Sequence, residues 1–221
     1  MPTEVKICGL SDEESMDAAV EAGADFVGLV FFPPSPRNIA IERAADLAGR
    51  ARGKARIVAL TVDADDALLS DIAARLSPDL LQLQGKETPE RVAVIRTMTG
   101  IPVMKAIHVS EPADLERIED YRDADRFLLE PKPPKDSTRP GGNAAAFDWS
   151  ILKGFSTPVP WLLAGGLTPA NAASSLAKTG APGVDVSSGV ESALGRKDPE
   201  LIRSFVRAVR DFDRAPQRIA S

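Results

Sequence analysis

The stretch RFLLEPK, residues 126–132, places three apolar residues directly before a carboxylate, Glu130, and a proline. The apolar run predicts a buried strand, and Pro131, which has no backbone N–H to donate, should end that strand. A carboxylate in a protein core is costly unless it is paired or used. The pattern therefore places Glu130 at the carboxyl-terminal tip of a strand and makes that tip a candidate functional position.

Seven further apolar runs of strand length recur along the chain at regular intervals. They are near-continuous rather than alternating, which is typical of parallel strands that are covered on both faces. In chain order, the eight runs are VKICGL (5–10), DFVGLVFF (25–32), RIVALTV (56–62), LLQLQG (80–85), PVMKAIHV (102–109), RFLLEPK (126–132), PWLLAGGL (160–167) and GVDVSSGV (183–190).

Segments with apolar residues at helical spacing lie between these runs. The clearest cover residues 13–23, 42–51, 66–76, 90–98 and 199–212, and Gly23 stands where a helix C-cap is expected. Alternation of eight strands with helices in 221 residues predicts an α/β protein, a single-domain (β/α)8 TIM barrel over residues 1–221. A doubly wound open sheet is the structural alternative. It would usually need fewer strands, and its dinucleotide-binding form needs a GxGxxG motif after the first strand, which is absent.

Composition narrows the class of partner and the compartment. A net charge of -5, without a basic run, argues against nucleic acid. No stretch reaches about 18 consecutive apolar residues, and the first ten residues lack the layout of a secretory signal, so we expect no membrane contact. A single cysteine, Cys8, suits a reducing cytoplasm. With one histidine, His108, the chain offers no His-rich or Cys-rich metal site, and we expect no metal.

Polar residues at strand tips are the candidates for chemistry, because strand ends converge on one pocket in a barrel. Strands one and six offer a thiol, Cys8, and a carboxylate, Glu130, a possible base and acid. Lys6 lies on the same strand face as Cys8 and would favour its thiolate if the two are close; alternatively, Cys8 is a small buried residue. His108 either lines the pocket or has a structural or solvent-facing role. The full set of tip residues is Cys8, Asp63, Gln82, Gln84, Lys105, His108, Glu130, Asp185 and Ser187.

Glycine and serine follow strands seven and eight, where barrels frequently bind phosphate through backbone N–H groups. The residues concerned are Gly165, Gly166, Ser187, Ser188 and Gly189, with Thr168 and Pro169 expected to open the next helix. Ordinary tight turns are the alternative, but the pairing of both loops favours a phosphate site. Arg37, after strand two, can reach over the pocket toward an anionic group or stay solvated. The irregular stretch 131–148 after strand six favours a functional loop.

These motifs together resemble the phosphoribosylanthranilate isomerase family, in order and in spacing, from residue 5 to about residue 191. The resemblance is carried by KICGL, GLVFFPPSPRNI, LQLQG, KPPKDSTRPGG followed by FDW, LLAGGLTPAN and GVDVSSGVE. It implies a (β/α)8 enzyme of tryptophan biosynthesis that needs no cofactor. The implied substrate is N-(5-phosphoribosyl)anthranilate, a small phosphorylated sugar-anthranilate, which an Amadori rearrangement converts to 1-(o-carboxyphenylamino)-1-deoxyribulose 5-phosphate.

The resemblance also implies roles for individual residues. The family's general base falls on Cys8, and its general acid, an aspartate that ends strand six, falls on Glu130. The anthranilate carboxylate is expected near Arg37 and the sugar hydroxyls near Asp185. The phosphate is expected on the backbone of the glycine and serine residues after strands seven and eight.

The chain departs from the family pattern at two positions. Glu130 stands where the family has aspartate, and Gln84 stands where it has histidine. An alternative to the isomerase is therefore an impaired or non-catalytic barrel that still binds a phosphorylated sugar. A further alternative is the isomerase of histidine biosynthesis, which resembles a pair of half-barrels with an aspartate at each catalytic strand tip, whereas strand one here ends in cysteine and no half-length repeat is visible. Another is a Schiff-base aldolase that uses Lys105. Both a monomer and a homodimer suit a barrel of this size.

Overall fold

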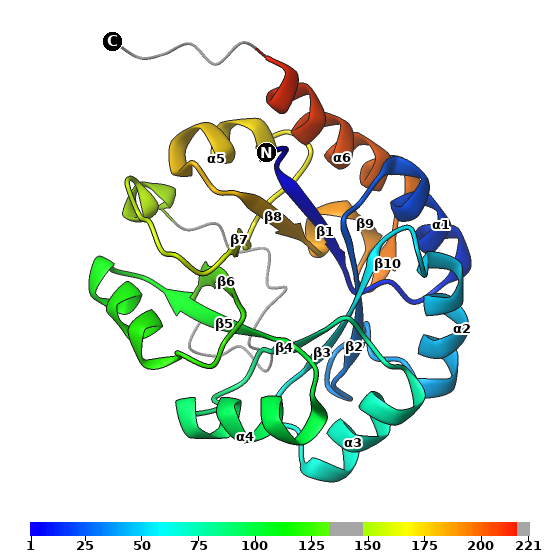
Figure 1. The fold of residues 1–221 in the computed structure, drawn as a ribbon. Helices are drawn as coiled ribbons and strands as arrows, with labels where there is room; N and C mark the ends of the chain where they lie inside the picture. The colour runs from blue at the N-terminus through cyan, green and yellow to red at the C-terminus, as the bar shows by residue number, and fades with distance from the viewer. Residues whose placement is uncertain (133–147, 216–221) are drawn as a thin grey trace.

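A computed structural model describes residues 1–132 and 148–215, and its centre is a closed barrel of eight parallel strands in sequential order (Figure 1). The predicted (β/α)8 barrel is confirmed, and each predicted apolar run coincides with one strand, although β1 begins one residue before its run. The strands are β1 (Glu4–Cys8), β2 (Phe26–Phe31), β3 (Arg56–Thr61), β4 (Leu80–Leu83), β5 (Val103–Val109), β6 (Arg126–Pro131), β7 (Trp161–Leu163) and β8 (Gly183–Val186).

Lys6 of β1 marks the closure of the barrel, since it stands opposite Phe26 of β2 on one side and Asp185 of β8 on the other. Strand β6 runs one residue beyond the predicted stop, because Pro131 still stands opposite Val109 of β5 as the last residue of the ladder. Glu130 is therefore the second-to-last residue of β6 and lies opposite His108 of β5.

Helices surround the barrel and follow most of its strands (Figure 1). The α-helices are α1 (Glu13–Ala22), α2 (Ile41–Ala51), α3 (Asp66–Arg75), α4 (Pro89–Thr99), α5 (Ala172–Thr179) and α6 (Pro199–Arg214), and the 3-10 helices cover Pro112–Asp120, Trp149–Leu152 and Ser188–Val190. Gly23 ends α1 in the left-handed conformation, with φ of 84°, as its position predicts. None of the described helices is long and apolar enough to cross a membrane.

The helix after β7 starts later than the sequence indicates. Thr168 and Pro169 were expected to open it, but α5 begins at Ala172 and Asn171 is its N-cap residue. The Asn171 carboxamide accepts a hydrogen bond from the Thr168 N–H at 2.7 Å, which closes a turn before the helix begins. A small antiparallel hairpin, β9 (Glu191–Ala193) and β10 (Arg196–Lys197), also follows β8 and was not predicted.

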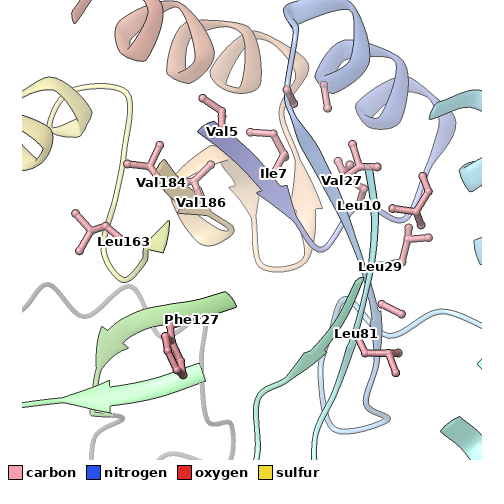
Figure 2. Close-up of a cluster of buried hydrophobic side chains, with 14 of the residues drawn as sticks. Val5, Ile7, Leu10, Val27, Leu29, Leu81, Phe127, Leu163, Val184 and Val186 are labelled. Atoms are coloured by element: carbon pink, nitrogen blue, oxygen red, sulfur yellow. The ribbon is translucent and has the colours of Figure 1, made fainter. Parts of the chain in front are cut away.

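Strand side chains alternate between two apolar layers. One set packs between the strands and the helices; Figure 2 shows members of it, among them Val5, Ile7, Val27, Leu29 and Phe127. The other set fills the barrel interior, and it comprises Phe26, Val58, Leu80, Met104, Ala106, Leu128, Leu162 and Ala164. Above that interior layer, Cys8 packs with Val30 and Leu60. Apolar side chains therefore fill the barrel interior beneath its carboxyl-terminal end.

The long irregular segment 131–148 lies largely outside the described residues, since positions 133–147 are not described. The prediction that this segment is a functional loop, and the KPPKDSTRPGG part of the family resemblance, cannot be placed in the structure. Asp148, which ends it, caps the short helix Trp149–Leu152 and accepts a hydrogen bond from the Ser150 N–H at 2.9 Å.

Candidate active site

A pocket lies at the carboxyl-terminal ends of the barrel strands. The structure brings seven of the candidate residues together in its wall: Cys8, Arg37, Gln82, Gln84, Glu130, Asp185 and Ser187. The remaining wall is formed by Val30, Phe32, Ser35, Leu60, Val62 and Leu128. The wall therefore combines apolar side chains with acids, amides and a guanidinium group.

Cys8 lies at the end of β1 and is 4% exposed. Burial raises the pKa of its thiol, while the nearby Lys6 ammonium works in the opposite direction. Lys6 itself is completely buried and donates a hydrogen bond to the Asp185 carboxylate at 2.8 Å. Burial would lower the pKa of Lys6, but the attraction of Asp185 holds it above the ordinary value, so the ammonium stays charged beneath the pocket.

The space beside Cys8 depends on a glycine in the neighbouring strand. A Cβ built at Gly28 of β2 would lie 3.1 Å from Cys8 Sγ and 3.1 Å from Lys6 Nζ. Gly28 is thus the position at which β2 leaves room for a thiol and an ammonium group to lie next to each other.

Glu130 is 5% exposed, and its side chain is held by polar groups from β5 and from the residue that follows β4. Its Oε1 accepts a hydrogen bond from Gln84 Nε2, and His108 Nε2 lies 2.9 Å from the same oxygen. Gln84 accepts in turn from Gln82 Nε2 at 2.6 Å. Burial raises the pKa of Glu130; its hydrogen bond with His108 opposes that rise, and Asp185 adds to it. A carboxyl group in this setting is suited to carry a proton into a reaction.

Arg37 lies in the loop after β2 but is not solvated, since only 4% of its surface is exposed. Its Nε and one terminal nitrogen donate to the two oxygens of Glu191, at 2.6 Å and 2.9 Å. Lys197 Nζ also donates to Glu191 Oε1, at 2.8 Å. Burial alone would raise the pKa of Glu191, but the bonds from Arg37 and Lys197 hold it below its ordinary value. The other terminal nitrogen of Arg37 donates to no residue among those described, and so can bind an anion.

The loops after β7 and β8 lie against each other, beside the pocket. Gly165 and Gly166 both have positive φ, of 91° and 63°. A Cβ at Gly189 would lie 1.7 Å from the Leu167 carbonyl oxygen, so only glycine permits this approach of the two loops. Within the described part of the chain, the N–H groups of Gly166, Ser188 and Gly189 donate to no acceptor. Three unused N–H groups on adjoining loops can receive an anion.

Other strand-tip residues do not join the pocket. Lys105 faces away from it, and its ammonium donates to Glu87 Oε2 at 2.9 Å and to the Gly85 carbonyl at 2.7 Å. The Asp63 carboxylate accepts from the Lys86 N–H at 2.6 Å. His108 is absent from the residues that line the pocket and contacts Glu130 instead. The lysine required by a Schiff-base aldolase is thus engaged elsewhere.

Sequence reasoning missed Glu191, which binds Arg37, and Lys197, which binds Glu191. Both are charged residues close to the end of a strongly apolar run, and both are almost fully buried, with side-chain exposures of 5% and 0%. The spacing of Glu191 and Lys197 around Gly195 is typical of a β-hairpin. Recognition of that hairpin in the sequence could have indicated that the two residues lie close together. Among the described residues, no group of three or more His, Cys, Asp or Glu side chains could hold a metal ion.

Residues 5–208 match the profile of the family described as N-(5'-phosphoribosyl)anthranilate (PRA) isomerase. The chain belongs to the phosphoribosylanthranilate isomerase family. A relative of that name from Paramagnetospirillum magneticum is 58% identical over 211 residues, which cover 95% of this chain and 98% of the relative. One from Rhizobium meliloti is 54% identical over 211 residues, with 95% and 98% covered.

Solved structures agree with this assignment. Phosphoribosylanthranilate isomerase from Thermotoga maritima superimposes with a TM-score of 0.83 at 34% identity, over 95% of this chain and 99% of that one. A phosphoribosylanthranilate isomerase in complex with reduced 1-(o-carboxyphenylamino)-1-deoxyribulose 5-phosphate gives a TM-score of 0.80 at 32% identity, over 95% and 99%. The family prediction is confirmed, and the alternative of an impaired binding barrel gains no support from these relatives.

Proposed function

We propose that the chain converts N-(5-phosphoribosyl)anthranilate to 1-(o-carboxyphenylamino)-1-deoxyribulose 5-phosphate, a step of L-tryptophan biosynthesis, by general acid-base catalysis. The single observation that carries the proposed mechanism is that Cys8 and Glu130 line one pocket. Relatives that bear the isomerase name match nearly the whole chain.

Glu130 is the general acid and Cys8 the general base. Glu130 gives its proton to the ring oxygen of the furanose, the bond from that oxygen to the carbon bearing the amine breaks, and a Schiff base forms. The Cys8 thiolate then takes the proton from C2′, and the resulting enol becomes the ketone of the product. A raised pKa suits Glu130, which must begin protonated, whereas Cys8 must lose its proton against the effect of burial. The buried Lys6 ammonium favours that thiolate.

The remaining pocket residues bind and orient the substrate. The unused terminal nitrogen of Arg37 receives the anthranilate carboxylate. The aromatic ring lies against the apolar wall that Val30, Phe32 and Leu60 provide. Asp185 faces the sugar hydroxyls. The phosphate binds the backbone of the two loops after β7 and β8, in which Gly165, Gly166, Ser187, Ser188 and Gly189 lie.

Further assignments belong to the same proposal. Residues 1–221 form one barrel domain, which works as a monomer or a homodimer. The reaction needs no cofactor and no metal, because the acid and the base are side chains of the pocket. The partner is the phosphorylated substrate rather than nucleic acid or a membrane. The presence of a single cysteine favours the cytoplasm as the compartment.

Steady-state turnover of freshly generated phosphoribosylanthranilate by the natural protein, Glu130→Ala and Glu130→Asp tests the proposal. We expect the natural protein to be active and Glu130→Ala to lose about 10²–10⁴-fold, the usual contribution of a general acid. Glu130→Asp should be intermediate, since it keeps the acid but withdraws it by one methylene. An inert natural protein that Glu130→Asp activates would contradict the proposed role of Glu130 and support an impaired barrel instead.

A further inference from the structure

Glu130 has two carboxyl oxygens in different surroundings. Oε1 accepts from Gln84 Nε2, and His108 Nε2 lies 2.9 Å from it, within hydrogen-bonding distance. Oε2 makes no hydrogen bond with any residue that the structure describes. A carboxyl oxygen has two lone pairs, so two donors occupy Oε1 fully.

We infer that His108 is a positioning residue for the proposed acid: with Gln84 it saturates Glu130 Oε1 and leaves Oε2 as the oxygen that delivers the proton. This inference rests on the proposed role of Glu130. A protonated carboxyl with both donors on Oε1 has its hydrogen on Oε2, where no described group competes for it. Once the proton has left, the same two donors stabilise the carboxylate.

The position of His108 fits this role. His108 stands on β5 with the same inward parity as Met104 and Ala106, directly opposite Glu130 in the ladder. It does not line the pocket, and 22% of its side chain is exposed. The glutamate side chain has one more rotatable bond than aspartate, so a second donor restricts a carboxyl group that would otherwise have more freedom.

The matched pair His108→Gln and His108→Met separates the donor from the bulk of the side chain. Glutamine places an N–H donor at about the reach of Nε2, and methionine has nearly the same length without a donor. The measurement is the single-turnover rate with enzyme in excess, together with KM and thermal unfolding. We expect His108→Gln to stay within a few-fold of the natural protein and His108→Met to lose about 10–100-fold, with KM almost unchanged.

Equal rates in the two variants would overturn the inference, and so would a loss confined to KM. Glu130→Ala and the double variant Glu130→Ala/His108→Met complete the test. Because His108 acts through Glu130, His108→Met should cost nothing further once Glu130 is absent, and an additive loss would overturn the inference. If Glu130→Ala keeps its turnover, the proposed acid itself is wrong. If Glu130→Ala is inactive and the two His108 variants are alike, only the role of His108 fails.

Discussion

The two ends of the barrel both carry charged pairs, but they differ in how much water reaches them. At the amino-terminal end, Glu4 bonds to Arg56 and Arg126, and the side chains of Glu4 and Arg56 are 27% and 47% exposed. Arg56 also lies 3.7 Å from the centre of the Phe26 ring. At the carboxyl-terminal end, the paired Lys6 and Lys197 side chains have no exposed surface.

This difference separates two uses of charge. An ion pair that is open to water contributes little to stability, so replacement of Glu4 should lower the free energy of unfolding only slightly. A buried ion pair does not stabilise a protein more than apolar residues of the same size would. Removal of one partner is nevertheless strongly destabilising, because it leaves the other charge buried without a counter-charge. The carboxyl-terminal end keeps such pairs at Arg37 and Asp185, around the proposed chemistry, where an anion and a proton must be handled.

The largest effect that we expect concerns the thiol. Cys8→Ser should lower turnover by about 10²–10⁴-fold, because a serine hydroxyl is a far weaker base than a thiolate at the same point. Binding of the reduced product analogue, measured by calorimetry, should stay nearly intact. If binding disappears together with turnover, Cys8 is a packing residue and not the base.

The comparison of the two ends is sharpest in the matched variants Glu191→Ala and Glu4→Ala. Glu191→Ala leaves Arg37 and Lys197 buried without their shared carboxylate, and should lower the free energy of unfolding by about 3–5 kcal/mol. Glu4→Ala removes a partly exposed carboxylate whose partner Arg56 faces water, although Arg126 is only 11% exposed, and should cost about 1 kcal/mol. Urea unfolding of both variants measures the difference. Equal losses would remove the distinction between the two ends.

A smaller effect is expected where the backbone leaves room for the thiol. Gly28→Ala would place a methyl group 3.1 Å from Cys8 Sγ and from Lys6 Nζ, and should cost about 1–3 kcal/mol of stability with a parallel loss of turnover. Gly49→Ala is the control, because Gly49 is exposed on α2 with open space around it. That change should stabilise the protein by about 0.5–1 kcal/mol. A Gly28→Ala variant with natural stability and turnover would show that the space at Gly28 is unimportant.

Local patterns in the sequence predicted the strands and most of the helices, because apolar runs and caps act over a few residues. Side chains of a strand point alternately to its two faces, and this alternation could also have shown which polar residues of the fifth strand face the barrel interior. Lys105 has the opposite parity to the inward residues Ala106 and His108, and it bonds outside the pocket. Convergence of Cys8 and Glu130 in one pocket followed from the barrel topology alone.

Pairings across the barrel could not be read from the sequence. Arg37 and Glu191 are 154 positions apart, and Gln84 and Glu130 are 46 apart. Such contacts depend on the register of strands and on loop conformations that one sequence does not encode in any short pattern. The start of α5 was missed for a related reason: the Asn171 side chain competes with the helix by closing a turn on Thr168.

The hairpin formed by β9 and β10 has a consequence for loop grafting. Within seven residues it carries Glu191, which grips Arg37, and Lys197, whose ammonium donates to the Ser187 carbonyl at 2.9 Å. Gly195 at its turn lies so close to Pro36 that a Cβ would stand 2.9 Å from the Pro36 carbonyl oxygen. An engineer who exchanges this hairpin to alter specificity would therefore disturb the anthranilate end and the phosphate end of the proposed site together. The loops after β2 and β8 have to be redesigned as one unit.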